Sequence, residues 1–492
     1  MNEGGKSDRF VVPANLLNKA AAAEAGEERE RAEGNTDGET RPGRSAGPGV
    51  SSGLDRVREV ARRDKDARFT ALLHHVTLER LRWAYWALSP KAAPGLDGVT
   101  WEDYGRDLEA NLRDLHERVQ GGRYRAKPSR RAYIPKADGR LRPLGIAALE
   151  DKIAQRAVVE VLNAVYEVDF RGFSYGFRPG RGQHDALDAL TTGIARKKVN
   201  WVLDADIRDF FTSVDRRWLE KFLRHRIADE RVLRLVGKWL AAGVMEDGVW
   251  SEGAGTPQGA SASPLLANVY LHYVLDLWAE WWRDRARGDV IIVRFADDFI
   301  VGFEHLGEAR RFLRDLRERC AKFGLELHPE KTRLIEFGRF AAGNRASRGV
   351  GKPETFDFLG FTHICGKTRS GRFEVKRVTI AKRLRAALSR VKDQLRNRLH
   401  LPIPEQGRWL ASVVRGHMAY YAVPGNIHAV AAFRKQVTRL WYKALRRRSQ
   451  RTTVNWARMK RIGDRWLPRA RITHPYPYAR FAARTQGRSP VR

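Results

Sequence analysis

A helical repeat of apolar residues is the clearest pattern in the first half of the chain. Between Ala154 and Tyr166 the apolar side chains recur every three or four positions, at Ala157, Val158, Val161, Leu162 and Val165. This spacing places them on one face of a helix. The sequence therefore predicts a core helix here.

A period of two residues replaces the helical one from Trp201 to Phe211. One face of this segment carries Trp201, Leu203, Ala205 and Ile207, and the other carries Val202, Asp204 and Asp206. Such alternation predicts a strand, in this case with carboxylates on one of its faces.

A pair of acids, Asp297 and Asp298, separates two apolar runs between Ile291 and Phe303. A short acidic turn between two arms rich in β-forming residues predicts a hairpin. Because helical and strand-like segments alternate irregularly along the chain, we expect an α+β fold.

The C-terminal part of the chain has a helical and basic pattern. Strand-like patterns fade beyond about Lys376, and apolar residues then recur at helical spacing among arginines and lysines. They are Leu384, Leu388, Val391, Leu395 and Leu399 in one run, and Phe433, Val437, Leu440 and Leu445 in a second. We expect amphipathic helices here. Residues 1–66, in contrast, hold few large apolar groups, and we expect a disordered tail.

The charge of the chain makes a polyanion the expected partner. The 492 residues, enough for two or three domains, include 92 lysines and arginines against 58 acids, a formal net charge of +34. Residues 376–492 alone hold 29 lysines and arginines and three acids, a net charge of +26. Membrane surfaces are also anionic, but no apolar run approaches the roughly 18 residues of a membrane span. We therefore expect a nucleic acid rather than a membrane as partner.

Carboxylates are the candidate metal ligands of this sequence. Its two cysteines, Cys320 and Cys365, exclude a disulfide framework and a zinc site built from cysteine pairs. Asp206, Asp297 and Asp298 could converge to hold two Mg2+ ions, as phosphoryl transfer to a 3'-hydroxyl requires. An acid pair alone is more often a solvated turn, but this pair stands between apolar runs, where unpaired charge is costly.

A resemblance to a known family appears when several motifs are read together. The core motifs are ADIRDFF (205–211), GTPQGASASPLLANVYL (255–271) and RFADDF (294–299). They are joined by RRAYIPKADGRLRPLGI (130–146), FSYGFRPGRGQHDAL (173–187), GLELHPEKT (324–332), FDFLGF (356–361) and the later RGHMAYYAVPGNIHAVAAF. In this order they resemble bacterial group II intron reverse transcriptase/maturases, from about Arg68 to Tyr478.

The resemblance implies a right-hand polymerase fold. Fingers and palm would span residues 67–375, a helical thumb and maturase domain 376–478, and a basic tail 479–492. Many relatives end in an HNH-type endonuclease stabilised by cysteine pairs, and the absence of cysteine beyond Cys365 argues against one here.

Specific roles follow from the same resemblance. It implies that Asp206, Asp297 and Asp298 bind two Mg2+ ions, that Lys136 and Arg142 cover the incoming triphosphate, and that Gln258 and Gly259 form a turn at the nucleotide or template. Phe211, with Phe210 as its rival, would exclude the ribose 2'-hydroxyl, and Lys331 would protonate the leaving pyrophosphate. Arg178 would contact the template or support the fingers. The simpler alternatives are surface cations, a plain turn and core aromatic rings.

The function that the resemblance implies is double. The polymerase would copy group II intron RNA into cDNA at a DNA target, using a primer and deoxynucleoside triphosphates, in the bacterial cytoplasm near the nucleoid. The basic region would bind the intron RNA and assist its splicing, with Arg434, Lys435, Arg446, Arg447 and Arg448 as candidate contacts. Aromatic residues among these cations suit RNA recognition; they are Trp409, Tyr420, Tyr421, Trp441, Tyr442 and Trp456. The alternatives are a splicing cofactor without polymerase activity and a domesticated or defence-associated reverse transcriptase.

Overall fold

A four-stranded antiparallel sheet organises the centre of the molecule. The computed structural model describes residues 48–135, 141–246, 248–252, 255–256, 259–448 and 454–485. The strands of the central sheet, which we call the palm sheet, have the order β6-β7-β3-β8. They are β3 (Trp201–Asp206), β6 (Val290–Phe295), β7 (Asp298–Phe303) and β8 (Arg333–Glu336). The predicted strand and hairpin are both confirmed.

Both faces of the palm sheet are buried along most of its length. Leu203 and Ala205 of β3 belong to the larger hydrophobic core, together with Phe312. Val202, on the opposite face, belongs to a second core that contains Leu190. The helices that cover the sheet are α7 (Gln183–Arg196), α11 (Ser263–Leu271), the π-helical turn η2 (His272–Asp276), α12 (Leu277–Arg283) and α13 (Leu306–Lys322). The acids at the end of β3 therefore emerge from a rigid support.

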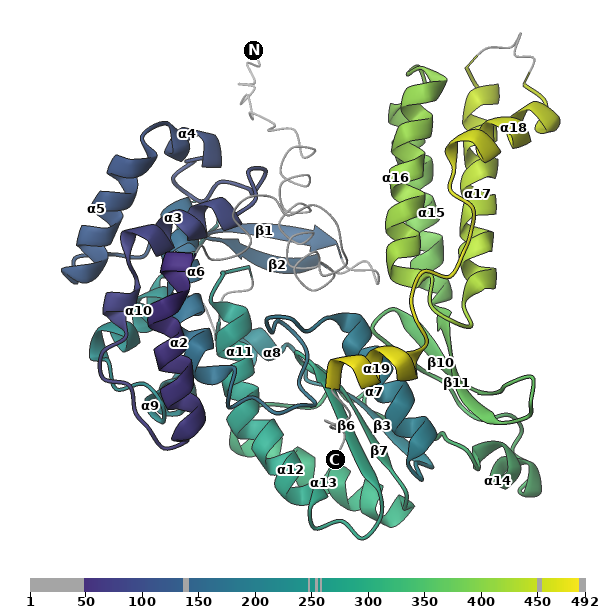
Figure 1. The fold of residues 1–492 in the computed structure, drawn as a ribbon, viewed down its shortest axis with the longest axis horizontal. Helices are drawn as coiled ribbons and strands as arrows, with labels where there is room; N and C mark the ends of the chain where they lie inside the picture. Colours follow the sequence, from purple (N-terminus) through teal and green to yellow (C-terminus); the bar gives the residue numbers. More distant parts are fainter. Residues whose placement is uncertain are drawn as a thin grey trace, which may run out of the picture.

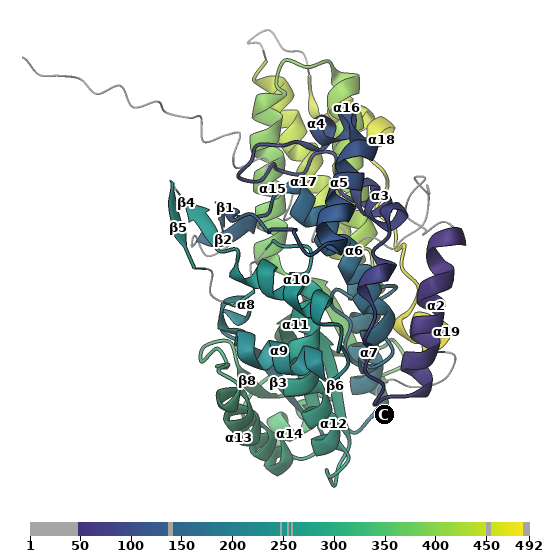
Figure 2. The same ribbon diagram turned by 90° about the vertical axis from the view of Figure 1, so that its left-hand side faces the viewer.

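Helices and a second sheet form the fingers beside the palm (Figure 1). The helices are α2 (Pro48–Arg63), α3 (Leu78–Ala87), α4 (Trp101–Arg106), α5 (Leu108–Gln120) and α6 (Leu149–Tyr166), with the 3-10 turn η1 (Leu73–His75). The sheet has the order β2-β1-β4-β5. Its strands are β1 (Ser129–Pro135), β2 (Leu141–Ile146), β4 (Val244–Glu246) and β5 (Val249–Ser251), and Figure 2 shows β4 and β5 at the margin of the molecule. Three further helices lead from the palm to this sheet: α8 (Phe210–Ser213), α9 (Arg216–Arg224) and α10 (Glu230–Ala241). The core helix predicted between Ala154 and Tyr166 is confirmed as part of α6.

The predicted tail over residues 1–66 is wrong for its last part. Residues 1–47 lie outside the described residues, but α2 is a regular helix that packs against α6. Its buried residues Leu54, Val57 and Ala61 are only 2%, 7% and 0% exposed. Three apolar residues on one face are enough to stabilise this helix, because the neighbouring helix α6 completes their burial. The local composition of the sequence does not reveal that neighbour.

A third sheet connects the palm to a bundle of helices that we call the tower. This sheet has the order β11-β10-β9, with β9 (Phe356–Phe358), β10 (Phe361–Lys367) and β11 (Phe373–Thr379), and α14 (Ala341–Ser347) precedes it. The tower comprises α15 (Ala381–Asn397), α16 (Ile403–Tyr421), α17 (Ile427–Arg446) and α18 (Trp456–Trp466). The predicted boundary at residue 376 falls inside β11, so the helical region begins only at Ala381. No helix of the described ranges is long and apolar enough to cross a membrane.

The last described helix returns from the tower to the palm. This helix, α19 (Pro477–Thr485), packs on α7, far from the tower tip (Figure 1). Arg480 of α19 forms an ion pair with buried Asp188 of α7 at 2.6 Å, and Asp188 pairs with Arg377 of β11 at 2.8 Å. The predicted boundary between domain and tail at 478/479 is therefore wrong, because a buried partner on α7 fixes the helix that spans it.

Candidate active site

Three carboxylates meet where the palm hairpin turns. Asp206 is the last residue of β3 and stands in register with Asp298, the first residue of β7. Directly paired residues project from the same face of a sheet, so the two side chains are neighbours. Phe295 pairs with Asp298, which leaves Ala296 and Asp297 as a two-residue turn. This register brings Asp206 beside Asp298 and leaves Asp297 in the adjoining turn.

Mutual repulsion and burial make this cluster electrostatically costly. Burial, and then the charge of Asp206, raise the pKa of Asp297 to about 6, against the opposing charges of Arg142 and Lys331. The pKa of Asp298 lies well above its usual range because of burial and the charges of Asp204, Asp297 and Asp206. Bound cations would relieve this repulsion. Below about pH 6, cation binding would have to displace a proton from Asp297.

A fourth carboxylate, Asp204, belongs to the same face. Burial raises the pKa of Asp204 to about 6, and Arg333 of β8, at 3.5 Å, opposes the shift. The strand alternation predicts Asp204 on the same face as Asp206, but it assigns no role to this residue. Among the neighbouring charges, that of Asp204 contributes most to raising the pKa of Asp298, so Asp204 is part of the electrostatic environment of the site.

The carboxylates suit Mg2+ by their chemistry, without forming a closed cage. In the described part of the chain, no group of three or more His, Cys, Asp or Glu side chains is arranged so that it could hold a metal ion by itself. Mg2+ does not require such a cage, since it binds one or two carboxylates and completes its octahedron with waters and substrate phosphates. Lys331 donates a hydrogen bond to Asp206 and so compensates one charge of the cluster.

The candidate nucleotide contacts lie around these acids where the structure describes them. Arg142 is exposed on β2, and its charge lowers the pKa of Asp297, which places it on the acidic side of the palm. Gly259 has a φ of 102°, and a Cβ there would lie 2.9 Å from the carbonyl oxygen of Gly145 in β2. Glycine is needed at this close approach. Lys136 and Gln258 lie outside the described residues.

The two adjacent phenylalanines have different environments. Phe210 is 2% exposed in the larger core, where its ring centroid lies 6.4 Å from that of Tyr270. Phe211 is only partly buried, and its carbonyl oxygen accepts a hydrogen bond from the backbone of Thr256 at 2.8 Å. Phe211 packs against the same core but keeps some exposure, whereas Phe210 is a fully buried core residue.

Arg178 supports the fingers rather than the template. Its side chain is 2% exposed and pairs with Glu167 at 2.6 Å. It also donates to the carbonyl oxygens of Arg171 and Ser174, both at 2.7 Å. Because these interactions all lie inside the protein, the guanidinium of Arg178 is not available to a strand of nucleic acid.

The basic residues predicted to contact RNA divide into two groups. Lys435, Arg446 and Arg447 are exposed on α17 and just beyond it. Arg434, in contrast, binds Asp464 and the carbonyl oxygen of Pro468, each at 2.9 Å, and so holds α18 against α17. Arg448 donates to the carbonyl oxygen of Leu401. These two predictions are corrected, because both guanidinium groups hold parts of the tower together.

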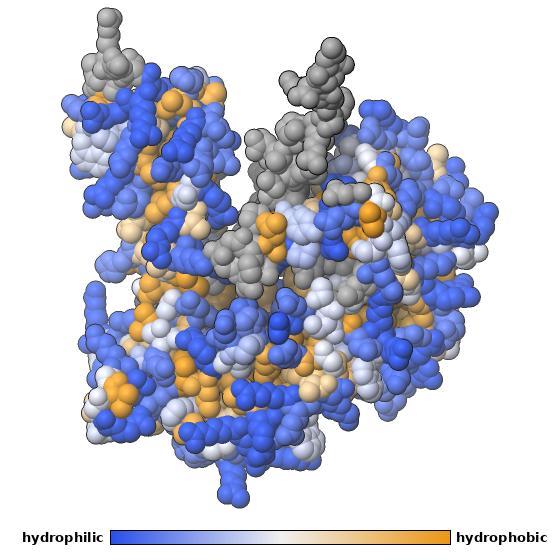
Figure 3. All heavy atoms as spheres, turned by 180° about the vertical axis from the view of Figure 1, so that it is seen from behind, coloured by the Kyte–Doolittle hydropathy of each residue, from blue (hydrophilic) through white to orange (hydrophobic). Residues whose placement is uncertain are grey.

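The tower aromatics divide in the same way. Trp441 is 0% exposed and donates to Gln406 at 2.7 Å, so it belongs to the tower core. Trp456 is 44% exposed, and its ring lies 5.4 Å from that of Tyr442, over which the guanidinium of Arg446 stands at 5.8 Å. Figure 3 shows mostly hydrophilic residues on this face of the tower.

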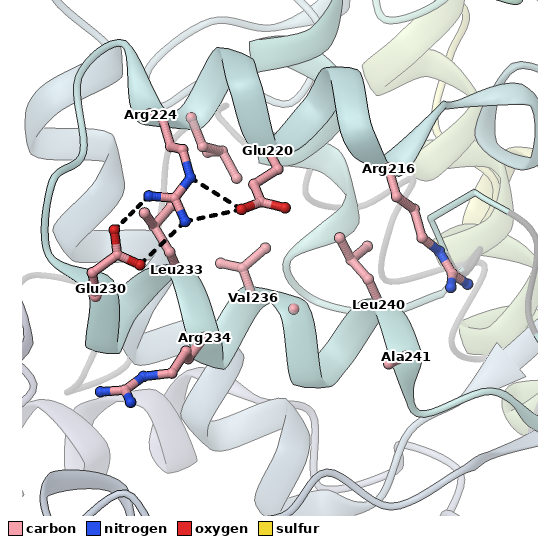
Figure 4. A pocket seen from close by; sticks show the side chains of 11 residues that line it. Arg216, Glu220, Arg224, Glu230, Leu233, Arg234, Val236, Leu240 and Ala241 are labelled. Atoms are coloured by element: carbon pink, nitrogen blue, oxygen red, sulfur yellow. Dashed lines mark hydrogen bonds and ion pairs between the residues drawn. The ribbon is translucent and has the colours of Figure 1, made fainter.

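A separate hollow lies between α9 and α10 (Figure 4). Its volume is about 400 Å3, and part of its lining is apolar, from Leu233, Val236 and Leu240. Three of its five charged residues are engaged with one another, since Arg224 pairs with Glu220 at 2.9 Å and also with Glu230. We assign no chemistry to this hollow.

Comparisons with known proteins identify relatives of this chain. The family model described as reverse transcriptase (RNA-dependent DNA polymerase) matches residues 134–363, from β1 to β10. Protein YkfC of Escherichia coli (strain K12) is 34% identical over 299 residues, which cover 53% of this chain and 78% of that protein. Group II intron-encoded protein LtrA of Lactococcus lactis subsp. cremoris is 31% identical over 238 residues, 47% of this chain and 39% of that protein. A Schizosaccharomyces pombe relative, the uncharacterized 91 kDa protein in cob intron, is 41% identical over 146 residues, 30% of this chain and 18% of its own length.

Proposed function

This chain belongs to the family of group II intron reverse transcriptases and maturases, and on that premise we propose that it is a Mg2+-dependent RNA-directed DNA polymerase whose tower binds intron RNA. The observation that supports the proposed polymerase activity is the strand register that sets Asp206 opposite Asp298, with Asp297 in the adjoining turn. Its substrates would be group II intron RNA, a target DNA with its primer, and deoxynucleoside triphosphates. These partners favour a location in the bacterial cytoplasm, near the nucleoid.

The residues of the site have distinct roles in nucleotidyl transfer. When bound, two Mg2+ ions stabilise the attacking 3' oxygen and the charge on the leaving pyrophosphate. Asp206, Asp297 and Asp298 would hold the ions. Arg142 neutralises charge on the incoming triphosphate, and Lys331 exchanges its contact with Asp206 for the leaving pyrophosphate, to which its Nζ gives a proton.

The direct test is primer extension on an RNA template. With Mg2+ and deoxynucleoside triphosphates, the protein is expected to extend a DNA primer, and a chelator in excess of the metal is expected to stop extension completely. Extension products resolved on a sequencing gel measure both outcomes. Extension that continued in the chelator would contradict the carboxylate mechanism. If extension failed with every divalent cation while intron RNA still bound, the protein would instead be a splicing cofactor.

The sugar selectivity of the site should depend on Phe211. Replacing this partly exposed ring, Phe211→Val, opens space beneath the sugar, so ribonucleotide incorporation is expected to rise roughly tenfold or more, about the selectivity of one apolar contact. The use of deoxynucleotides should change little. Single-nucleotide kcat/KM values for dNTP and rNTP measure the ratio.

The neighbouring core ring offers a matched control. Phe210→Leu is expected to lower stability, because it removes buried volume, and to leave the ratio of dNTP to rNTP use unchanged. If only the Phe210 variant altered the ratio, the assignment of Phe211 as the gate would be wrong.

The maturase activity would reside in the exposed basic surface of the tower. Lys435, Arg446 and Arg447 provide cations for phosphates, and Trp456 provides an exposed ring for a splayed base. None of these residues lies in the palm, so RNA binding and polymerisation depend on different side chains.

A further inference from the structure

A fully buried arginine stands behind the catalytic hairpin. Arg294 of β6 is 0% exposed. Its Nε lies 2.7 Å from Oδ1 of Asp276 and its Nη2 lies 2.6 Å from Oδ2, a bidentate ion pair. Such a pair has a fixed geometry, because both components are planar.

The remaining nitrogen of this guanidinium reaches the turn itself. Nη1 of Arg294 donates to the carbonyl oxygen of Ala296 at 2.9 Å and to Oδ1 of Asn268 at 3.0 Å. Ala296 is the residue before Asp297, and its φ of 58° is unfavourable for a residue with a Cβ. The turn keeps this conformation only where the surroundings impose it, and Arg294 is the side chain bonded to its carbonyl group.

The opposite side of the turn is fixed by the same network. A Cβ at Gly176 would lie 2.3 Å from the backbone nitrogen of Ala296, so the two backbones are in close contact. The side-chain nitrogen of Asn268 donates to the carbonyl oxygen of Gly176 at 2.8 Å. Asn268 thereby joins both sides of the turn, through Arg294 on one and Gly176 on the other.

The π-helical turn η2 explains how one helix can supply both partners of Arg294. Asn268 lies in α11, and Asp276 is the last residue of η2. In a regular α-helix, residues eight apart differ by about 80° in direction, because each residue turns by about 100°. A π turn accommodates one extra residue, so Asp276 comes to within about 20° of the direction of Asn268.

We propose that Arg294 is a positioning residue for the metal site, which holds the backbone of Ala296 so that Asp297 and Asp298 face Asp206, and that η2 serves to bring Asp276 onto it. The inference rests on the proposed function, since it concerns the binding of the metal ions. Stability alone does not explain the pair, because a buried ion pair is often no more stabilising than apolar residues of similar volume.

Metal binding without turnover provides the test. Mn2+ uptake is measured by EPR on the protein bound to a dideoxy-terminated primer on an RNA template with the next dNTP. Arg294→Lys keeps the charge but loses the bidentate geometry and the bond to Ala296. It is expected to need roughly tenfold more Mn2+ for half-occupancy, as is typical when a residue that orients a metal ligand is changed. The Mg2+ concentration for half-maximal extension should rise in parallel.

A second buried pair supplies the matched control. Arg377 and Asp188 are each 1% exposed and pair at 2.8 Å, but they lie between β11 and α7. Arg377→Lys should lower the melting temperature about as much as Arg294→Lys and leave Mn2+ binding unchanged. Asn268→Ala, which spares the ion pair, is the milder variant and should shift Mn2+ binding by roughly two- to threefold.

Each outcome decides the proposal. A shift in Mn2+ binding for the Arg294 and Asn268 variants but not for the Arg377 variant supports it. Wild-type Mn2+ binding by both would overturn it, and if Arg294→Lys did not fold, Asn268→Ala alone would decide. If wild-type protein bound no Mn2+ and extended no primer, the proposed function would be wrong and this inference would fall with it.

Discussion

Replacing Asp297 with asparagine is expected to reduce primer extension by about a thousandfold or more and to leave intron RNA binding intact. Asparagine keeps the size of the side chain but removes a charge that faces the metals, and a thousandfold loss corresponds to about 4 kcal/mol of transition-state stabilisation. The fold should survive, because burial and the charge of Asp206 raise the pKa of Asp297, so removing its charge relieves an unfavourable interaction in the apo protein. Single-turnover extension and RNA binding, at one salt concentration, measure the two activities.

An exposed acid away from the site serves as the control for this variant. Asp284, whose side chain is 64% exposed after α12, can be changed to asparagine with no expected effect on either activity. Loss of RNA binding by a folded Asp297→Asn protein would contradict the division between a catalytic palm and an RNA-binding tower.

Removing three exposed cations of the tower is expected to weaken RNA binding about a hundredfold near 0.1 M salt. Each phosphate neutralised by a cation releases counterions, so a variant with Lys435, Arg446 and Arg447 changed to glutamine should also lose about two units of salt slope. Filter binding of intron RNA over a series of salt concentrations measures both quantities. Extension of a short generic primer–template should stay close to normal.

The control for this variant carries the same charge change elsewhere. Arg310, Arg317 and Lys322 are exposed on α13 of the palm. Their replacement by glutamine should alter the salt slope for intron RNA much less. Equal losses in both variants would mean that RNA binding follows total charge and has no specific location in the tower. Truncation at residue 376 is unsuitable for this purpose, because it would cut β11 and open the second core.

The carboxylates of the candidate site could be predicted from the sequence more readily than the residues that hold the surrounding elements in place. The strand and hairpin follow from local periodicity, and pairing of β3 with β7 then brings Asp206 to Asp298. Helix α2 and the internal roles of Arg434 and Arg448 depend on partners distant in sequence, which periodicity does not identify. The same holds for Arg294, which reads as an ordinary cation in the sequence until Asp276 and Asn268 are seen beside it.

The return of α19 to the palm has a consequence for the order in which the molecule matures. Asp188 of α7 is buried between Arg377 and Arg480, which follow it by almost two hundred and almost three hundred positions in the chain. A buried carboxylate without its partners is strongly unfavourable, so the packing of α7 is completed only after both arginines have been synthesised. Since Arg480 follows the tower in the chain, the contact of α19 with α7 can form only after the whole tower has been synthesised. The order of synthesis therefore makes the docking of α19 one of the last steps in the folding of this chain.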